Sequence, residues 1–270
     1  MTLNTSAERV DWLIQRSDEI YDEIDQVYDG EIRYNRMLRL GINTLGIALR
    51  EGHNLSEVGA MLRDMPLNNP DVKGPLDALA HDYGKQIRGT LDRQHQPETD
   101  ARHAIHLMRL SPEYAAIIDP TLDANKVAGY GLGHDLVEAR AGDTVTVNLT
   151  EKAKAEKDLR EAKGLAALRA EFYASYPELI EYIEAYEALE EPEAEFTKSN
   201  DKFEPSFTHL HNQGFQLVNV HGIKTAEQLL ADTARSTARM MPYASKFPLL
   251  MEDRAELIRR VIEATYPKAA

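Results

Sequence analysis

The chain has 270 residues, of which 43% are hydrophobic and 28% charged, a composition typical of a globular protein long enough to bury a substantial core. Its formal net charge of −14 argues against nucleic acid polymers and anionic membranes as partners, because long-range repulsion would oppose both. The sequence contains no cysteine, which excludes disulfides and thiolate catalysis and leaves histidine and carboxylate as its strong metal ligands.

Helices are expected along nearly the whole chain, because apolar residues recur at i, i+3 and i+4 spacing between capping and proline signals. In chain order, the expected helices are 6–28, 31–51, 76–87, 99–110, one beginning at 111, 123–140, 151–173, one beginning at 177, 191–205, 224–240 and 249–265. The pattern predicts an all-α fold without internal repeats and without a flexible linker between domains.

Local signals set several of these boundaries. Either Thr99 or Asp100 is suited to cap a helix, and Pro112 fits the first turn of the next one. The stretch 89–97 is turn-prone because of its glycine and proline. The β-branched stretch 144–148 is the one convincing strand-like segment, although an extended loop fits it equally well.

The segment 131–143 concentrates groups that can bind a metal ion and move a proton. His134 and Asp135 are adjacent, and Glu138 lies four residues after His134, on the same face of a continuous helix. His103 upstream and Asp201 downstream are the candidate partners. Two imidazoles with two carboxylates suit Mn, Co, Fe, Ni or Zn better than an all-oxygen site would, and Mg is a lesser candidate. Such a site supports metal-assisted hydrolysis.

The order of these ligands carries a family resemblance. It resembles the HD-domain phosphohydrolase superfamily, and the strings 98–103 and 134–143 resemble its 5′-deoxynucleotidase (YfbR-like) branch. The match covers roughly residues 86–205. It implies an HD-domain helical bundle and hydrolysis of a phosphate ester on a deoxynucleotide. It also implies one divalent metal ion held by His103, His134, Asp135 and Asp201.

The resemblance implies further roles. Glu138 matches the carboxylate that handles the proton, Asp143 the residue near the sugar 3′-hydroxyl, and Arg88 a phosphate-binding arginine. Gly89 departs from the pattern, because the branch has a bulky tryptophan there that crowds the ribose 2′ side. The resemblance therefore does not extend to discrimination against ribonucleotides. From their charge, the candidates to attract a small anionic substrate are Arg88, Arg93, Arg102 and Lys202.

Other histidines have simpler interpretations. His81 is followed by Asp82, but no glutamate lies four residues after this histidine, so a surface or capping pair is favoured over a metal site. His106 is interpreted as a core histidine, with a contact to the site as the alternative. His209 and His211 form a His-X-His pattern without matching ligands nearby.

The leading functional hypothesis is a hydrolase that converts a deoxynucleoside 5′-monophosphate to nucleoside and phosphate. The alternatives are a deoxynucleoside triphosphohydrolase that releases tripolyphosphate and a nucleotide-binding HD module without turnover. The expected catalytic core, 86–205, is flanked by an N-terminal helical extension, 1–85, packed on it, and by C-terminal helices, 206–270, that complete the same domain. A homo-oligomer is also expected, with these flanking regions as candidate interfaces.

A cytoplasmic location is expected from two features of the sequence. No apolar run approaches the roughly 18 residues needed to cross a bilayer. The N-terminus lacks the basic and then apolar order of a signal peptide.

Overall fold

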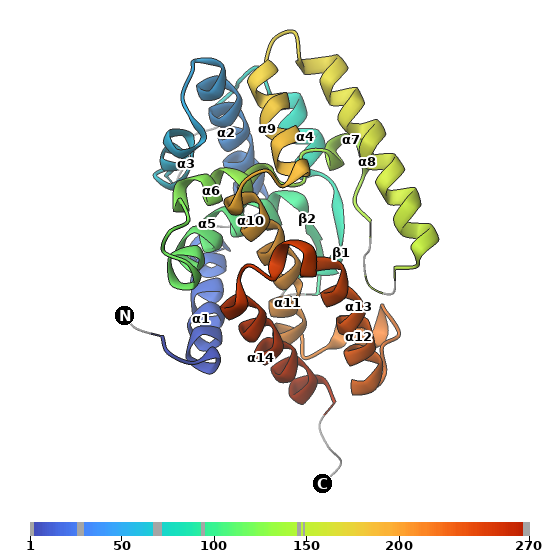
Figure 1. The fold of residues 1–270 in the computed structure, drawn as a ribbon. Coiled ribbons are helices and arrows are strands. Elements are labelled where there is room, and N and C mark those ends of the chain that lie inside the picture. Colours follow the sequence, from blue (N-terminus) through green and yellow to red (C-terminus); the bar gives the residue numbers. More distant parts are fainter. Residues whose placement is uncertain are drawn as a thin grey trace.

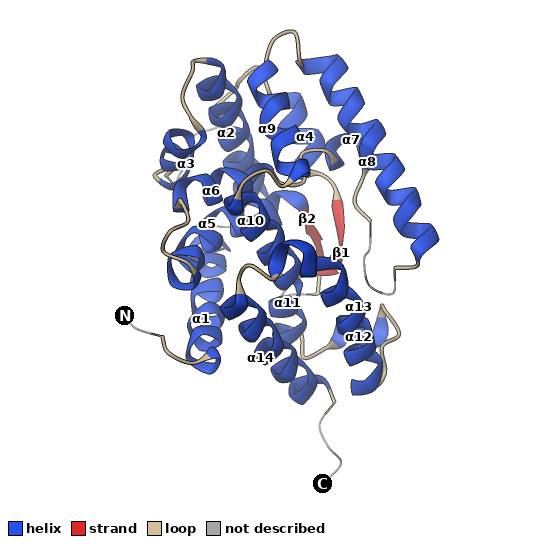
Figure 2. Cartoon of the chain, in the orientation of Figure 1, coloured by secondary structure: helices blue, strands red, loops and turns tan. Residues whose placement is uncertain are grey.

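The computed structural model describes residues 3–25, 30–66, 72–92, 95–144, 147 and 149–266. Within these residues the chain is all-α apart from one pair of short antiparallel strands, which confirms the predicted fold class (Figure 2). In chain order the elements are α1 (Ser6–Asp25), α2 (Gly30–Arg50), α3 (Leu55–Arg63), α4 (Asp77–Gly84), β1 (Ile87–Leu91), β2 (Pro97–Thr99), α5 (Asp100–Ile118), α6 (Ala124–Gly133), α7 (Glu138–Ala141), α8 (Glu151–Phe172), α9 (Pro177–Ala188), α10 (Pro192–Phe203), α11 (Pro205–His211), α12 (Phe215–Asn219), α13 (Ala226–Ala244) and α14 (Pro248–Thr265).

Helices α5 and α6 pack against each other, and helices from the N-terminal and the C-terminal parts of the chain pack on this pair (Figure 1). Helices α1, α2 and α10 pack on α5, while α3 and α10 pack on α6. Of the 19 residues of α5, 15 are buried. The helix that carries His103 therefore lies among protein side chains on nearly every side, and its side chains have little freedom to move.

Glycine permits the closest approach between these two helices. A Cβ atom at Gly131 of α6 would lie 3.0 Å from the Cα of Met108 and 3.1 Å from its backbone nitrogen. Backbone atoms cannot move aside as a flexible side chain can, so only glycine fits here without a shift of α6. Because His134 follows α6, this contact sets how near it comes to α5.

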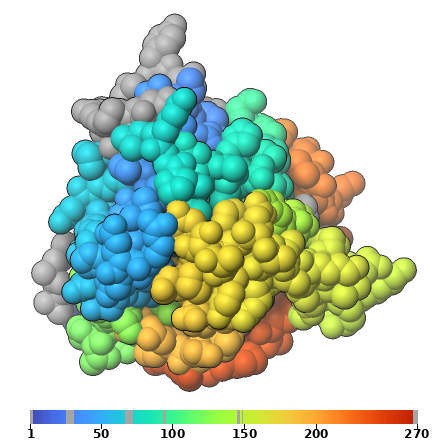
Figure 3. All heavy atoms as spheres, turned by 90° about the horizontal axis from the view of Figure 1, so that it is seen from above, coloured from blue at the N-terminus to red at the C-terminus, as the bar shows by residue number. Residues whose placement is uncertain are grey.

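Helix α8 differs from the others because it extends beyond the body of the molecule (Figures 1 and 3). Only Gly164 and Leu168 are buried along its 22 residues. It packs on α7 and α9. Pairs of opposite charge four residues apart, such as Lys154 and Asp158, whose Nζ and Oδ2 atoms are 2.6 Å apart, support the helix along its exposed surface.

Several predicted boundaries are confirmed within a few residues. Helix α2 matches the expected 31–51, and α8 matches the expected 151–173. Pro177 and Pro192 occupy the first turns of α9 and α10, where the missing N–H leaves no helical hydrogen bond unmade. Helices α3, α11 and α12 are not among the helices expected from the sequence.

The predicted helix boundary at Ser111 is wrong. Helix α5 continues through Pro112 to Ile118 although proline has no N–H to donate to the preceding turn. The residues on both sides of Pro112 are packed in the core, and the burial of Leu110 and Tyr114, both 0% exposed, outweighs the lost hydrogen bond. The cap at the other end is Thr99, whose side chain accepts a hydrogen bond from the Arg102 N–H.

Part of the turn-prone stretch 89–97 is a strand, because β1 spans 87–91 and pairs with β2, while the His95 N–H donates to the Asp92 carbonyl oxygen in the turn that follows. Contacts from distant segments hold the strand. The Gly89 N–H donates to Asp143, and the side-chain amide of Gln216 bonds the Gly89 carbonyl oxygen and the Leu91 N–H. The local sequence does not contain this information, because both partners come from other parts of the chain.

The predicted helix 123–140 is interrupted. Helix α6 ends at Gly133, and the backbone continues through turns with i to i+3 hydrogen bonds, such as Glu138 N–H to the Asp135 carbonyl oxygen at 2.8 Å. Such turns contain three residues each, so side chains three positions apart in the sequence lie on the same side of the backbone. Glu138 therefore lies beside Asp135, whereas the continuous helix had placed it beside His134.

The strand-like stretch 144–148 lies partly outside the described residues. Its described positions, Thr144 and Val147, are not in a strand. Among the residues that the structure describes, none of the helices combines the length and apolarity that a membrane crossing requires.

Candidate metal centre

Four side chains from three separate segments converge in the core. His103 comes from α5, His134 and Asp135 from the turn after α6, and Asp201 from α10. The His103 Nε2 atom lies 3.2 Å from His134 Nε2 and 3.1 Å from Asp201 Oδ1, and His134 Nε2 lies 2.8 Å from Asp135 Oδ2. Each residue offers one ligand atom, and these atoms all lie within 4.8 Å of one another. The structure thus brings together the four predicted ligands.

The other nitrogen of each imidazole is directed away from the cluster. His134 Nδ1 lies 3.0 Å from the Gly131 carbonyl oxygen, and a carbonyl can only accept, so Nδ1 carries the hydrogen and Nε2 is free to bind a cation. His103 Nδ1 lies 3.3 Å from Glu204 Oε2. Both rings therefore present Nε2 to the same point.

These positions fit a divalent cation. The Nε2 atoms of His103 and His134 face each other at 3.2 Å. Hydrogens on both atoms would repel each other, so at most one of the two can be protonated. Although burial and Arg88 oppose protonation, Glu204 and Asp201 raise the pKa of the His103 imidazole to about 10. The site thus favours added positive charge, which a metal ion held by two nitrogens and two carboxylates supplies.

Arg88, expected as a phosphate-binding residue, lies inside this group. Its Nη1 atom is 3.0 Å from Asp135 Oδ2 and 3.3 Å from Asp100 Oδ1, and its Nη2 atom is 3.7 Å from Asp201 Oδ1. Lys202 Nζ lies 2.5 Å from Asp201 Oδ2. Both cations therefore lie against the four-residue cluster, and each is paired with a carboxylate in it.

A second group of carboxylates adjoins the first. Asp100, Asp135 and Glu138 offer oxygens within 4.8 Å of one another. Burial, with the charge of Asp135, raises the pKa of Glu138 to about 10, and burial raises that of Asp100 to about 8. Lys157 of α8 brings its Nζ to 3.6 Å from Glu138 Oε1. The exposed helix α8 thereby contributes one charge to the site.

Sequence reasoning missed Asp100, Lys157 and Glu204. Asp100 was considered only as a helix cap, yet its position three residues before His103 puts both on one face of α5 and could have been recognised. Glu204 lies three residues after Asp201, at the end of α10, and this spacing could also have been recognised. No local signal indicates Lys157, because its contact with Glu138 depends on how α8 folds back onto α7.

The three other residues predicted to contact the substrate are Asp143, Arg93 and Arg102, and they differ in where they lie. Asp143 accepts a hydrogen bond from the Gly89 N–H at 3.1 Å, which places it beside β1. Arg93 lies outside the described residues. Arg102 faces away from the cluster, and its guanidinium lies 2.6 Å from both Asp25 and Asp92. It is therefore not available as an anion-binding group at this site.

The other histidines lie outside the four-residue cluster. His106 is buried behind His103, where its Nδ1 lies 3.0 Å from Glu204 Oε1. His209 packs against His221, and His211 Nε2 lies 3.0 Å from Asp18 Oδ1. His81 is exposed, as expected for a surface His-Asp pair.

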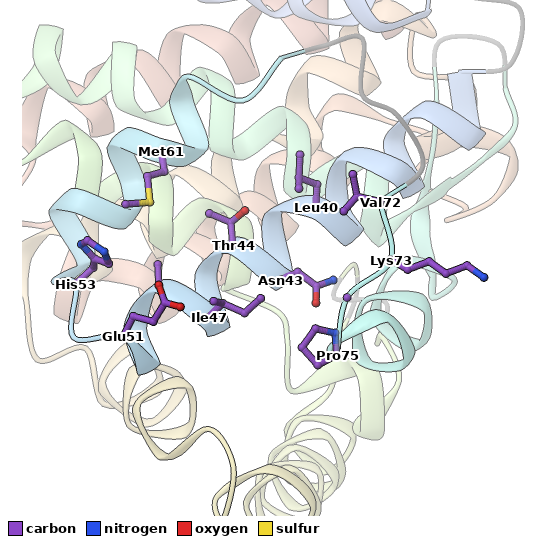
Figure 4. Close-up of a pocket in the computed structure, with 12 residues that line it drawn as sticks. Leu40, Asn43, Thr44, Ile47, Glu51, His53, Met61, Val72, Lys73 and Pro75 are labelled. Carbon is purple, nitrogen blue, oxygen red and sulfur yellow. The ribbon is translucent and has the colours of Figure 1, made fainter.

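A separate cavity lies between α2, α3 and residues 72–75 (Figure 4). It has a volume of about 340 Å³, and Leu40, Ile47, Met61 and Val72 give it apolar walls. It shares no lining residue with the four-residue cluster. The chemistry of the cluster is therefore independent of this cavity.

Comparison with known proteins places the chain in a family. The model of the HD domain matches residues 84–242, more than half of the chain, so the chain belongs to the HD domain family. Among solved structures, it is similar to a predicted metal-dependent phosphohydrolase from Magnetospirillum magnetotacticum MS-1, with 26% sequence identity, a TM-score of 0.50, and coverage of 67% of this chain and 88% of that chain. A search of curated proteins found no match.

The family and the cluster together define the class of the protein. It is a hydrolase of the HD family whose histidines and aspartates fit a divalent metal cofactor. The predicted superfamily is confirmed. The 5′-deoxynucleotidase branch and the division of the chain at residues 85 and 205 stay predictions.

Proposed function

We propose that this protein is a metal-dependent phosphohydrolase that converts a deoxynucleoside 5′-monophosphate to nucleoside and phosphate. The observation that supports it most directly is the convergence of His103, His134, Asp135 and Asp201 on one point. The similarity to the solved structure of a predicted metal-dependent phosphohydrolase supports the same reaction class. The choice of a nucleotide as substrate comes from the resemblance of 98–103 and 134–143 to the 5′-deoxynucleotidase branch.

The proposed site assigns separate tasks to its residues. His103, His134, Asp135 and Asp201 would hold a divalent ion, which would supply Lewis acidity toward a phosphate oxygen and lower the pKa of bound water. Glu138, buried next to Asp135, takes or relays the proton that the reaction moves. Lys202 and Arg88 offset the negative charge of the phosphoryl group, with Arg88 exchanging one of its carboxylate contacts for phosphate.

Asp143 and β1 are the proposed sugar side of the site. Asp143 is bonded to the Gly89 backbone, and its second oxygen can accept from the sugar 3′-hydroxyl. Gly89 presents no side chain toward the ribose 2′ position. We therefore expect ribonucleoside monophosphates to be hydrolysed alongside the deoxynucleotides.

The test is a screen of nucleoside mono- and triphosphates with Mn, Co, Zn and Mg, in which orthophosphate and tripolyphosphate are measured separately. Orthophosphate from monophosphates supports the proposal, whereas tripolyphosphate from triphosphates contradicts it. Asp135→Asn should abolish both metal binding and turnover, because it removes a charged ligand. His81→Gln, in the other His-Asp pair, is the matched control and should keep both.

A further inference from the structure

A buried carboxylate lies directly behind His103. Glu204 follows the end of α10 and is 1% exposed. Its Oε2 atom lies 3.3 Å from His103 Nδ1, and its Oε1 atom lies 3.0 Å from His106 Nδ1. It contacts none of the other three cluster residues through a hydrogen bond or ion pair within the described chain. Glu204 therefore lies on the far side of the His103 ring from the cluster.

Helix α1 contacts the other oxygen of this carboxylate. The Tyr21 hydroxyl donates to Glu204 Oε1 at 3.2 Å, and the Tyr21 ring stacks on His106 with ring centroids 4.3 Å apart. Ser17 Oγ lies 3.0 Å from His106 Nε2. These contacts join α1, α5 and the end of α10 in one buried polar network.

The two facing atoms lack other hydrogen-bond partners. His103 Nδ1 and Glu204 Oε2 are both buried, and neither makes an aligned hydrogen bond with a described residue. The two atoms lie 3.3 Å apart, close enough to form a hydrogen bond after a small rotation of the carboxylate. Leaving a buried donor or a buried acceptor unpaired costs free energy. Pairing His103 Nδ1 with Glu204 Oε2 would therefore stabilise both groups.

From these contacts we infer that Glu204 is a positioning residue, which keeps the hydrogen of His103 on Nδ1 and its Nε2 directed at the metal centre. This inference rests on the proposed function. His134 obtains the same orientation from a backbone carbonyl, which substitution cannot remove. Glu204 makes the orientation of His103 depend on a side chain. A carboxylate in this position also makes the imidazole more basic and thus a stronger ligand.

The test compares Mn²⁺ binding by wild type and Glu204→Gln in isothermal titration calorimetry. Glutamine keeps the size of the side chain but removes its charge, and its dissociation constant for Mn²⁺ should be about 10- to 100-fold higher than that of wild type. Tyr21→Phe is the matched control. It removes another contact of the same carboxylate but none to His103, so its dissociation constant should stay close to wild type.

A second measurement needs no variant. In the Zn²⁺-loaded wild type, long-range ¹⁵N NMR of the imidazoles should show the His103 hydrogen on Nδ1. A hydrogen on Nε2, or a Glu204→Gln protein with wild-type affinity, would overturn the positioning role while leaving the proposed function intact. A wild-type protein that binds no divalent ion would overturn both.

Discussion

Helices α5 and α8 have similar lengths and opposite environments. Helix α5 is buried over most of its surface and carries His103, whereas α8 is largely exposed and reaches the site with Lys157 alone. The sequence predicted α8 almost to the residue but ended α5 too early. In α8, alanine, lysine, arginine and glutamate favour a helix by themselves. In α5, packing against other segments overrides the proline that should have ended it.

The stability of a helix therefore has a different origin in the two environments. An exposed helix depends on its own residues, so single substitutions in it should have small and local effects. A buried helix depends on its neighbours, so substitutions in it should affect stability and the site together. The predictions below separate these cases.

The largest expected effect is on turnover. Glu138→Gln should keep metal binding, because Glu138 is not one of the four ligands, and should lower kcat by about 10²- to 10⁴-fold through loss of the proton carrier. Steady-state kinetics with calorimetry of Mn²⁺ binding would measure this. Glu156→Gln on exposed α8 is the control. Full activity of Glu138→Gln would remove Glu138 from the mechanism.

A pair of leucine substitutions compares the helices directly. Leu110→Ala in α5 removes a side chain that is 0% exposed and should lower the free energy of unfolding by about 2–5 kcal/mol. Leu159→Ala in α8 removes one that is 57% exposed and should change it by less than about 0.5 kcal/mol. Urea denaturation of both variants would measure the difference, and equal effects would contradict the comparison.

Acid should destabilise the buried part of the molecule through His209. Burial lowers the pKa of His209 to about 3, below the unfolded value of about 6.5, so folding favours its neutral form. Its contribution is complete above pH 6.5 and is lost as the pH falls, by about 1.4 kcal/mol per pH unit between these values.

The free energy of unfolding of His209→Gln should therefore fall less steeply than that of wild type between pH 6 and pH 4.5. The control is His53→Gln, since the His53 side chain is 41% exposed. Parallel pH profiles for wild type and His209→Gln would show that another group is responsible.

The smallest expected effect concerns the one charge that α8 brings to the site. Lys157→Met removes a cation 3.6 Å from Glu138, and because this distance is longer than a hydrogen bond, kcat should fall only about threefold to tenfold. Lys154→Met, one turn away and paired with Asp158, should leave kcat unchanged. Equal kcat values for the two variants would mean that α8 plays no part in the reaction.

The helical character of the chain and the four residues that meet at the centre can both be predicted without coordinates. Apolar spacing specifies amphipathic helices from local information, and the order of His103, His134, Asp135 and Asp201 along the chain carries the family resemblance. The bounds of α8 and the starts of α9 and α10 agree with the prediction because helix-favouring residues and first-turn prolines act locally.

The positions and contacts of these residues depend on the tertiary structure. It continued α5 past Pro112, broke the helix after Gly133 so that Glu138 lies beside Asp135, and turned Arg102 away from the site. It also brought Glu204 and Lys157 to their partners. Each of these results depends on contacts between segments far apart in the chain, and the energy of packing them together exceeds the local preferences that the sequence expresses.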